Sequence, residues 1–274
     1  MLVFLFLLLV SITSWSCQFQ TREDVSRPPV EVNVLRPTNQ NQMVTDSPWH
    51  DERKFSSNGF LEIININGNI EIESWDQEKV SVTAVVTHPQ EVLANQKASF
   101  DVKGEFDVLK QTTTSAKVLV VAPENWIVNL KLKVPRLCSF TQLMTKKGNI
   151  TLVGISGEAM VKIEKGNITV KNFEGPVIAE THEGSILFNG LKFYRRLDGK
   201  TNHGDVVVHF TKEEILNATF SGLAPAGVIH GPRYQELENI QWTSSEEERM
   251  IHGRWGRGQG QINLSTLRGN VVID

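Results

Sequence analysis

The chain has 274 residues and a formal net charge of −3. This near-neutral balance argues against a general nucleic-acid-binding protein, which would carry an excess of Lys and Arg. Hydrophobic residues make up 40% of the chain and charged residues 22%, so most of it is expected to fold. The 2 cysteines exclude a multi-disulfide scaffold and a four-Cys zinc site.

An apolar run, Leu2–Val10, opens the chain and is followed closely by Ser16 and Cys17. A membrane-spanning helix needs ~20 apolar residues, so the run fits the hydrophobic part of a signal peptide better. A cysteine after such a run and a small residue resembles the cleavage site of bacterial lipoproteins. We therefore expect a signal peptide at residues 1–16 and a lipid on Cys17. An ordinary secretory signal and a membrane-retained anchor are the alternatives, since no Lys or Arg precedes the run and Trp15 is bulky.

The segment from Cys17 to residue 52 is polar and carries several prolines: Pro28, Pro29, Pro37 and Pro48. Such a composition predicts an extended tether, followed by a folded domain over residues 53–274. Cys138 lies in an alternating stretch and is expected to be a small buried residue of a strand. If Cys17 carries no lipid, a Cys17–Cys138 disulfide is an alternative in an oxidising compartment.

Glycines recur at a fixed interval in the middle of the chain. They stand nine residues apart at Gly148, Gly157, Gly166, Gly175 and Gly184. A polar residue, most often Asn, follows the strongest of them, and both residue types permit the positive φ of a tight turn. The residues two and four positions after Gly68, Gly148, Gly166, Gly184, Gly204, Gly260 and Gly269 are all apolar: Ile70, Ile72, Ile150, Leu152, Ile168, Val170, Ile186, Phe188, Val206, Val208, Ile262, Leu264, Val271 and Ile273.

This alternation has the period of a β-strand with one buried face. Strong units recur 18 residues apart, at Gly148, Gly166 and Gly184, and then at Gly204 after a slip of two. Two strands per 18–20 residues predict an all-β fold, a parallel solenoid in which stacked coils share one core. An antiparallel β-sandwich is the alternative, because it also has strands every 8–12 residues.

One short helix is expected near residues 89–99, where Pro89 suits the first turn and good helix formers follow. Further strands are expected at Val102–Val108, Lys117–Val121 and Trp126–Val134.

Several stretches together resemble the bacterial putative adhesin family, a domain family of unknown function. They are Leu61–Asp76, Val80–Ala84, Leu130–Pro135, the series from Lys147 to Phe210, and Gly260–Ile273. The resemblance covers roughly residues 55–274. It implies a right-handed parallel β-helix-like solenoid and an exported, envelope-facing protein, and it supplies no catalytic residue.

The histidines and acids give little sign of a reactive site. His182 and His203 stand two and one residues before their glycines, so strand alternation predicts opposite faces and no shared metal site. Calcium ligation is not expected, because few carboxylates align along the repeat. Glu164, Glu174, Glu183 and Asp205 are candidates for an acid or base by residue type alone.

Aromatic residues offer a second kind of candidate. Trp255 stands between Arg254 and Arg257, where it could stack on a sugar ring or pack as a lid on the last coils. We favour the lid, and we expect Trp75 and Trp126 to be core or cap residues.

The sequence thus predicts a non-enzymatic, lipid-anchored envelope protein that displays a solenoid surface to an envelope protein or a surface glycan. It gives no reason to expect a cofactor, a metal or a nucleic-acid partner. A carbohydrate-active enzyme and an envelope-stress accessory protein are the alternative hypotheses.

Overall fold

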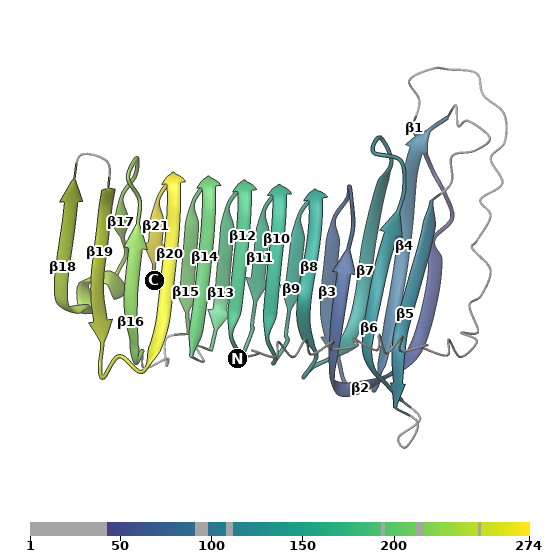
Figure 1. Cartoon of the computed structure of the whole chain (residues 1–274), viewed down its shortest axis with the longest axis horizontal. Helices are drawn as coiled ribbons and strands as arrows, with labels where there is room; N and C mark the ends of the chain where they lie inside the picture. The colour runs from purple at the N-terminus through teal and green to yellow at the C-terminus, as the bar shows by residue number, and fades with distance from the viewer. Residues whose placement is uncertain (1–42, 91–97, 108–111, 193–194, 212–215, 246–247) are drawn as a thin grey trace, which may run out of the picture.

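Glycine-punctuated alternation folds this chain into a flattened β-solenoid, which a computed structural model describes over residues 43–90, 98–107, 112–192, 195–211, 216–245 and 248–274. Coils lie side by side along one axis, and each contributes a strand to each of two faces, sheet A and sheet B (Figure 1). The repeat behind this is regular. Ile168 lies opposite Ile150 on one side and Ile186 on the other, so the predicted 18-residue coil is confirmed.

Sheet B carries one strand of every coil and ends in antiparallel strands. In spatial order it contains β5 (Ser99–Asp107), β6 (Thr112–Val121), β2 (Trp49–Ile64), β8 (Ser139–Lys147), β10 (Ala159–Lys165), β12 (Val177–Glu183), β14 (Arg196–His203), β20 (Gly260–Arg268), β16 (Ala218–Leu223), β19 (Glu248–Trp255) and β18 (Glu238–Ser245).

Sheet A carries the second strand of each coil. Its order is β1 (Met43–Thr45), β4 (Lys79–Pro89), β7 (Ile127–Pro135), β3 (Ile70–Trp75), β9 (Ile150–Val153), β11 (Ile168–Lys171), β13 (Ile186–Leu191), β15 (Val206–Phe210), β21 (Val271–Ile273) and β17 (Ile229–His230). The first half of β2 also pairs with β4, so β2 passes from one sheet to the other.

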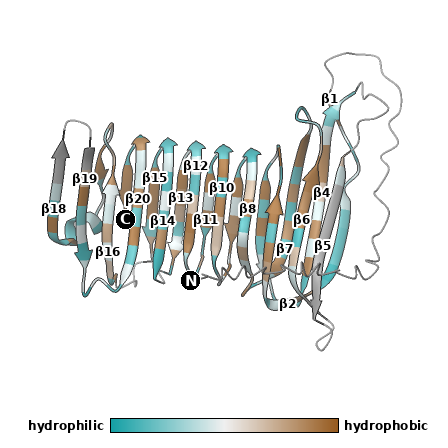
Figure 2. Cartoon of the chain, viewed as in Figure 1, coloured by the Kyte–Doolittle hydropathy of each residue, from teal (hydrophilic) through white to brown (hydrophobic). Residues whose placement is uncertain are grey.

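The core is a continuous column between the two sheets. All of the apolar positions predicted from the glycine pattern are at most 1% exposed, from Ile70 to Ile273. Figure 2 shows the resulting alternation of hydrophobic and hydrophilic segments along the strands. Stacking is what makes this burial possible, because each coil covers the apolar side chains of its neighbours.

Glycine is required at the turn between the two faces. Gly166 has a φ of +143°, and a Cβ added there would lie 1.9 Å from the carbonyl oxygen of Gly148. Gly184 repeats this arrangement on Gly166, with a φ of +144° and a Cβ-to-oxygen distance of 2.0 Å. The glycines therefore stack directly on one another, and no other residue fits without moving a backbone.

The polar residue after each glycine forms a ladder along the axis. The backbone amide of Asn167 donates to Oδ1 of Asn149, and the amide of Ser185 donates to Oδ1 of Asn167. The same bond joins neighbouring coils from one end of the column to the other, through Asn129, Asn69, Asn149, Asn167, Ser185, Asp205, Asn270 and Val228.

A second ladder is buried. The residue three positions before the glycine is a threonine in several coils, and its hydroxyl donates to the carbonyl of the glycine one coil away. Thr181 reaches Gly166 at 3.0 Å, and Thr201 reaches Gly184 at 2.7 Å. Ile163 takes this position in one coil and leaves the Gly148 carbonyl without such a donor.

The coils that come first and last in the sequence do not lie at the ends of the column. The coil of β20 and β21 fits between the coil of β14 and β15 and the coil of β16 and β17, although β16 precedes it in the chain (Figure 1). The coil of β2 and β3 is likewise enclosed, between β6 with β7 and β8 with β9. Antiparallel strands then flank each end, β4 and β5 at one and β19 and β18 at the other.

The last ten residues of the expected tether lie against the folded body. Residues 43–45 form β1 and residues 49–52 begin β2, and both strands pair with β4. The helix expected near residues 89–99 falls mostly on residues 91–97, outside the described residues, and its flanks belong to β4 and β5. Within the part of the chain that the structure describes, no helix has the length and apolar character needed to cross a bilayer.

Candidate functional site

A trough crosses the outer surface of sheet B, perpendicular to β8, β10, β12 and β14. It encloses about 380 Å³ and is lined by Met144, Thr145, Lys146, Lys162, Ile163, Glu164, Glu180, Thr181, His182, Lys200 and Asn202. Side chains from four successive coils form its two walls, so it runs along the solenoid axis.

The coil repeat builds both walls. Met144, Lys162, Glu180 and Lys200 stand four residues before their glycines, and Lys146, Glu164, His182 and Asn202 stand two before theirs. Residues two apart on a strand share a face. The register places equivalent positions of neighbouring coils in a row, and successive members of a row are about 4.8 Å apart because that is the distance between neighbouring strands. The trough is the space between these two rows.

Ion pairs connect neighbouring coils along the trough. Lys162 Nζ lies 3.0 Å from Glu180 Oε2, and Lys165 Nζ lies 2.9 Å from Glu183 Oε2. All four side chains are about half exposed, so these pairs add little to stability. They fix the position of the charges that the surface presents.

His182 and His203 lie together, which corrects the expectation of opposite faces. Their ring centroids are 6.0 Å apart in an edge-on arrangement, and Nδ1 of His182 is 2.7 Å from Nδ2 of Asn202. The reason is local: both residues stand at the end of a strand next to a glycine turn, where consecutive side chains reach solvent. Among the described residues, no group of three or more His, Cys, Asp or Glu side chains is arranged to hold a metal ion.

The carboxyl group of Glu183 is held in its ionised form. A hydrogen bond from Lys165 is the largest effect and lowers its pKa, desolvation opposes it, and the charges of Lys165, His182 and His203 lower the pKa further. A general acid needs the opposite shift, because it must carry a proton at working pH. Glu183 is therefore suited to binding a cation or a donor rather than to proton transfer.

The other acids from the sequence are spread over the molecule. Glu164 lines the trough and lies one position out of register with Glu183. Glu174 lies at the other turn of the coil, where its backbone forms isolated parallel β-bridges with Ser156 and Lys192. Asp205 belongs to the polar ladder, where its Oδ1 accepts the amide of Asn270 at 2.7 Å. They do not form one catalytic group.

Trp255, Trp126 and Trp75 have structural roles. Trp255 is 3% exposed, packs on Phe220 with ring centroids 5.4 Å apart, and donates through Nε1 to the carbonyl of Arg233. The lid interpretation is therefore confirmed. Trp126 is buried at 1% exposure in the N-terminal cap, and Trp75 donates to the carbonyl of Lys79.

Cys138 is fully buried and unpaired, and desolvation strongly raises the pKa of its thiol. It behaves as a core side chain, as expected. Cys17, the predicted lipidation site, lies outside the described residues.

The trough walls escaped the sequence analysis, although a signal existed. Apart from Met144, polar residues repeat four and two positions before the glycines, in the same frame as the apolar pattern.

No family model and no curated protein matches the chain. Two solved bacterial structures are similar to it at 10% sequence identity. One is a putative cell adhesion protein from Clostridium sporogenes, with a TM-score of 0.36 over 83% of this chain and 99% of the other. The second is a putative adhesin from Bacteroides fragilis, with a TM-score of 0.28 over 88% of this chain and 100% of the other.

Proposed function

We propose that this chain is a non-enzymatic envelope protein that displays a rigid solenoid and binds an extended ligand along sheet B. Cys17 would attach it to the membrane through a lipid, and the segment from Cys17 to the first strand would space it from the surface. The ligand would be an envelope protein or a linear surface glycan.

The trough is the observation that carries this proposal. The positions of its wall side chains repeat with the coil, so a chain-like ligand that lies along the axis would meet a pair of side chains at each step, with chemistry that differs from coil to coil. Lys146 and Lys200 belong to these walls at its two ends, both exposed, and the Lys162–Glu180 pair lies between them. Binding then depends on many weak polar contacts held at fixed spacing, which needs rigidity rather than a reactive group.

A carbohydrate-active enzyme is the second candidate, because Glu164 and Glu180 line the same trough. This candidate is weaker. Glu180 is ion-paired with Lys162, and a glycosidase needs a second carboxyl group that holds a proton. Release of sugars by the wild type but not by Glu164→Gln would favour the enzyme.

Charge reversal on one face tests the binding surface. The double variant Lys146→Glu/Lys200→Glu alters the trough, and Lys131→Glu/Lys171→Glu makes the same charge change on exposed positions of sheet A. Each chain would be incubated with detergent-solubilised envelope and with an array of linear glycans. We expect the trough variant to bind at least about tenfold more weakly than the wild type, and the sheet A variant to bind like the wild type. Equal binding by both variants would exclude the trough.

The anchor is tested separately. Mass spectrometry of the chain purified from membranes should show a lipid on residue 17, and Cys17→Ala should move the protein to the soluble fraction. A wild-type chain that is soluble and carries no lipid would contradict the anchor while leaving the trough untouched.

A further inference from the structure

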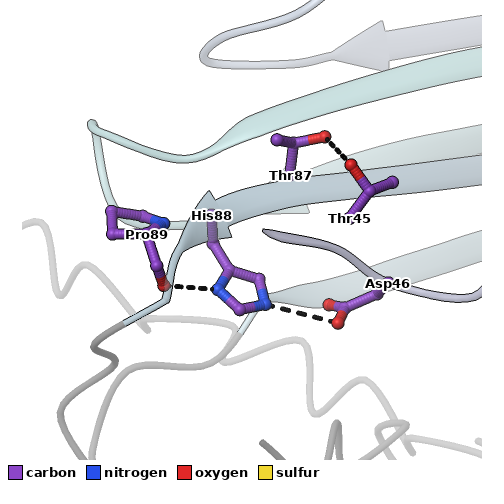
Figure 3. Close-up of polar contacts among 5 residues, drawn as sticks. All are labelled: Thr45, Asp46, Thr87, His88 and Pro89. Carbon is purple, nitrogen blue, oxygen red and sulfur yellow. Dashed lines mark hydrogen bonds and ion pairs between the residues drawn. The ribbon is translucent and has the colours of Figure 1, made fainter. Parts of the chain in front are cut away.

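His88 is a buried, titratable residue with no role in the trough. It lies at the end of β4 beside β1 and is 1% exposed. Its Nδ1 is 2.8 Å from the carbonyl oxygen of Pro89, and its Nε2 is 3.3 Å from Oδ1 of Asp46 (Figure 3).

Both ring nitrogens thus face acceptors. The carbonyl of Pro89 has no proton, so Nδ1 must donate to it. An ionised Asp46 has none either, so Nε2 must donate as well, although a neutral imidazole has a single N–H. The arrangement therefore requires one additional proton, on His88 or on Asp46.

The surroundings favour the imidazolium form. Trp126 stacks on the ring with centroids 4.8 Å apart, and an aromatic face attracts a cation. Asp46 supplies the opposite charge, and its Oδ2 is buried without a hydrogen-bond partner. Without the proton, a partly buried carboxylate would face the lone pair of Nε2. Among the described residues, Asp46 is the titratable group in contact with His88.

We propose that His88 and Asp46 form a proton-dependent latch that holds β1 against β4. The strand is short: Met43, Val44 and Thr45 pair with Pro89, His88 and Thr87. Beyond the ladder, the contacts of this segment among the described residues include the Asp46 amide to the carbonyl of Val86 at 2.9 Å and the Thr45–Thr87 hydroxyl pair at 3.0 Å. Loss of the His88–Asp46 ion pair therefore removes one of the few contacts that hold β1 against β4.

The direction of the effect follows from proton counting. The docked strand holds one proton more than a released strand in which His88 is neutral and Asp46 is ionised. Release is then favoured by rising pH, by up to about tenfold per pH unit. Because β1 is the first described strand after the predicted tether, the latch sets whether that end of the tether is fastened to the cap.

Hydrogen–deuterium exchange of the purified full chain tests the latch. The amides of residues 43–46 would be followed from pH 5.5 to pH 8.5 and corrected for intrinsic exchange. We expect the opening constant of β1 to rise steeply above about pH 6.5, while β11 amides stay protected throughout. An opening constant that does not change with pH would overturn the proposal.

Asp46→Asn separates the proton from the contact. An asparagine amide can donate to the lone pair of a neutral His88 while Nδ1 still donates to Pro89, so β1 should stay docked and lose its pH dependence. His50→Gln is the control. His50 is exposed and hydrogen-bonds Thr83 of β4, the strand that carries His88, and its loss should leave the pH dependence of β1 unchanged. An unchanged slope in Asp46→Asn would contradict the latch.

Nitrogen-15 NMR of the imidazole gives a measurement that needs no variant. Both nitrogens of His88 should carry protons at pH 7 in the wild type. A neutral ring with one protonated nitrogen and an ionised Asp46 would overturn the proposal even if the variants failed to fold.

Discussion

The backbone amide of Asn167 donates to Oδ1 of Asn149 across 2.9 Å, from one coil to the next. Asn167 then accepts the amide of Ser185 in the same way. The polar residue after each of these glycines therefore connects neighbouring coils, because its side-chain oxygen accepts a hydrogen bond from a backbone amide of the next coil.

Replacing Asn167 with alanine should remove one rung of this ladder. We expect a loss of about 1 kcal/mol in the free energy of unfolding, since the amide of Ser185 loses its acceptor at a solvent-exposed position. Asn167→Asp keeps Oδ1 and should cost less. Urea denaturation measures both.

Asn189→Ala serves as the control for Asn167→Ala. Asn189 is an exposed residue of β13, outside the ladder, so its loss should change stability by less than about 0.5 kcal/mol. Equal losses at the two positions would contradict a special role for the ladder.

Gly166→Ala should be far more damaging. The new Cβ would lie 1.9 Å from the Gly148 carbonyl at a φ of +143°, and that carbonyl belongs to a stacked turn that cannot move alone. We expect a loss of about 4 kcal/mol or more, measured by urea denaturation, or failure to accumulate folded protein.

Gly256→Asn is the comparison for Gly166→Ala. Gly256 has a φ of +57°, which asparagine tolerates, and a Cβ there would find its nearest atoms 3.5 Å away. It should cost about 1 kcal/mol or less. A mild effect at Gly166 would show that the turns are more adaptable than their stacking indicates.

The coil itself could be predicted because its determinants are local. Glycine, a polar residue and two alternating apolar side chains recur in one frame, and each is explained by the turn or by the core. The spatial order of the coils could not be predicted in the same way. Any unit of this kind can stack on any other, so nothing in Gly260–Ile273 indicates that it lies inside β16 rather than beyond it.

The site was predicted less well, for a reason that concerns side-chain reach. Strict alternation separates His182 from His203, but at a strand end two consecutive side chains can both point to solvent. The His88–Asp46 contact joins residues 42 positions apart and leaves no local pattern. By contrast, the packing of Trp255 and the burial of Cys138 follow from composition and were predicted correctly.

Thr181→Val tests how much the buried threonine ladder contributes to the free energy of unfolding. The hydroxyl of Thr181 donates to the Gly166 carbonyl at 3.0 Å, and valine of similar shape would leave that carbonyl without the donor. We expect a loss of about 1–3 kcal/mol in urea denaturation. Thr169→Val, on the outer face of sheet A, should stay within about 0.5 kcal/mol of the wild type. If both substitutions are neutral, the hydroxyl ladder contributes nothing to stability.

Removing Lys165 should change how Glu183 titrates. The hydrogen bond from Lys165 is the main cause of the lowered pKa of Glu183, so Lys165→Met should raise that pKa toward its ordinary value. The sign follows: the favourable contact is present above the unfolded carboxyl value and fades as acid protonates Glu183. Carbon-13 NMR of the carboxyl group measures the shift. His182→Asn should have a smaller effect, and the reverse order would contradict the assignment of Lys165 as the dominant partner.

Deleting the last coil should disconnect a part of the protein that precedes it in the sequence. β20 lies between β14 and β16, and β21 lies between β15 and β17, so a chain that ends at residue 259 leaves β16 and β17 with no coil to stack on. We expect limited proteolysis to remove the region of β16 to β19 from this truncated chain, while the coils from β8 to β13 stay resistant because their neighbouring strands are unchanged. A milder change, Ile262→Ala, removes a fully buried side chain of β20 and should cost about 2–5 kcal/mol while keeping the same order of cleavage. If β16 to β19 remained protected in the truncated chain, the final coil would not be the element that joins them to the column.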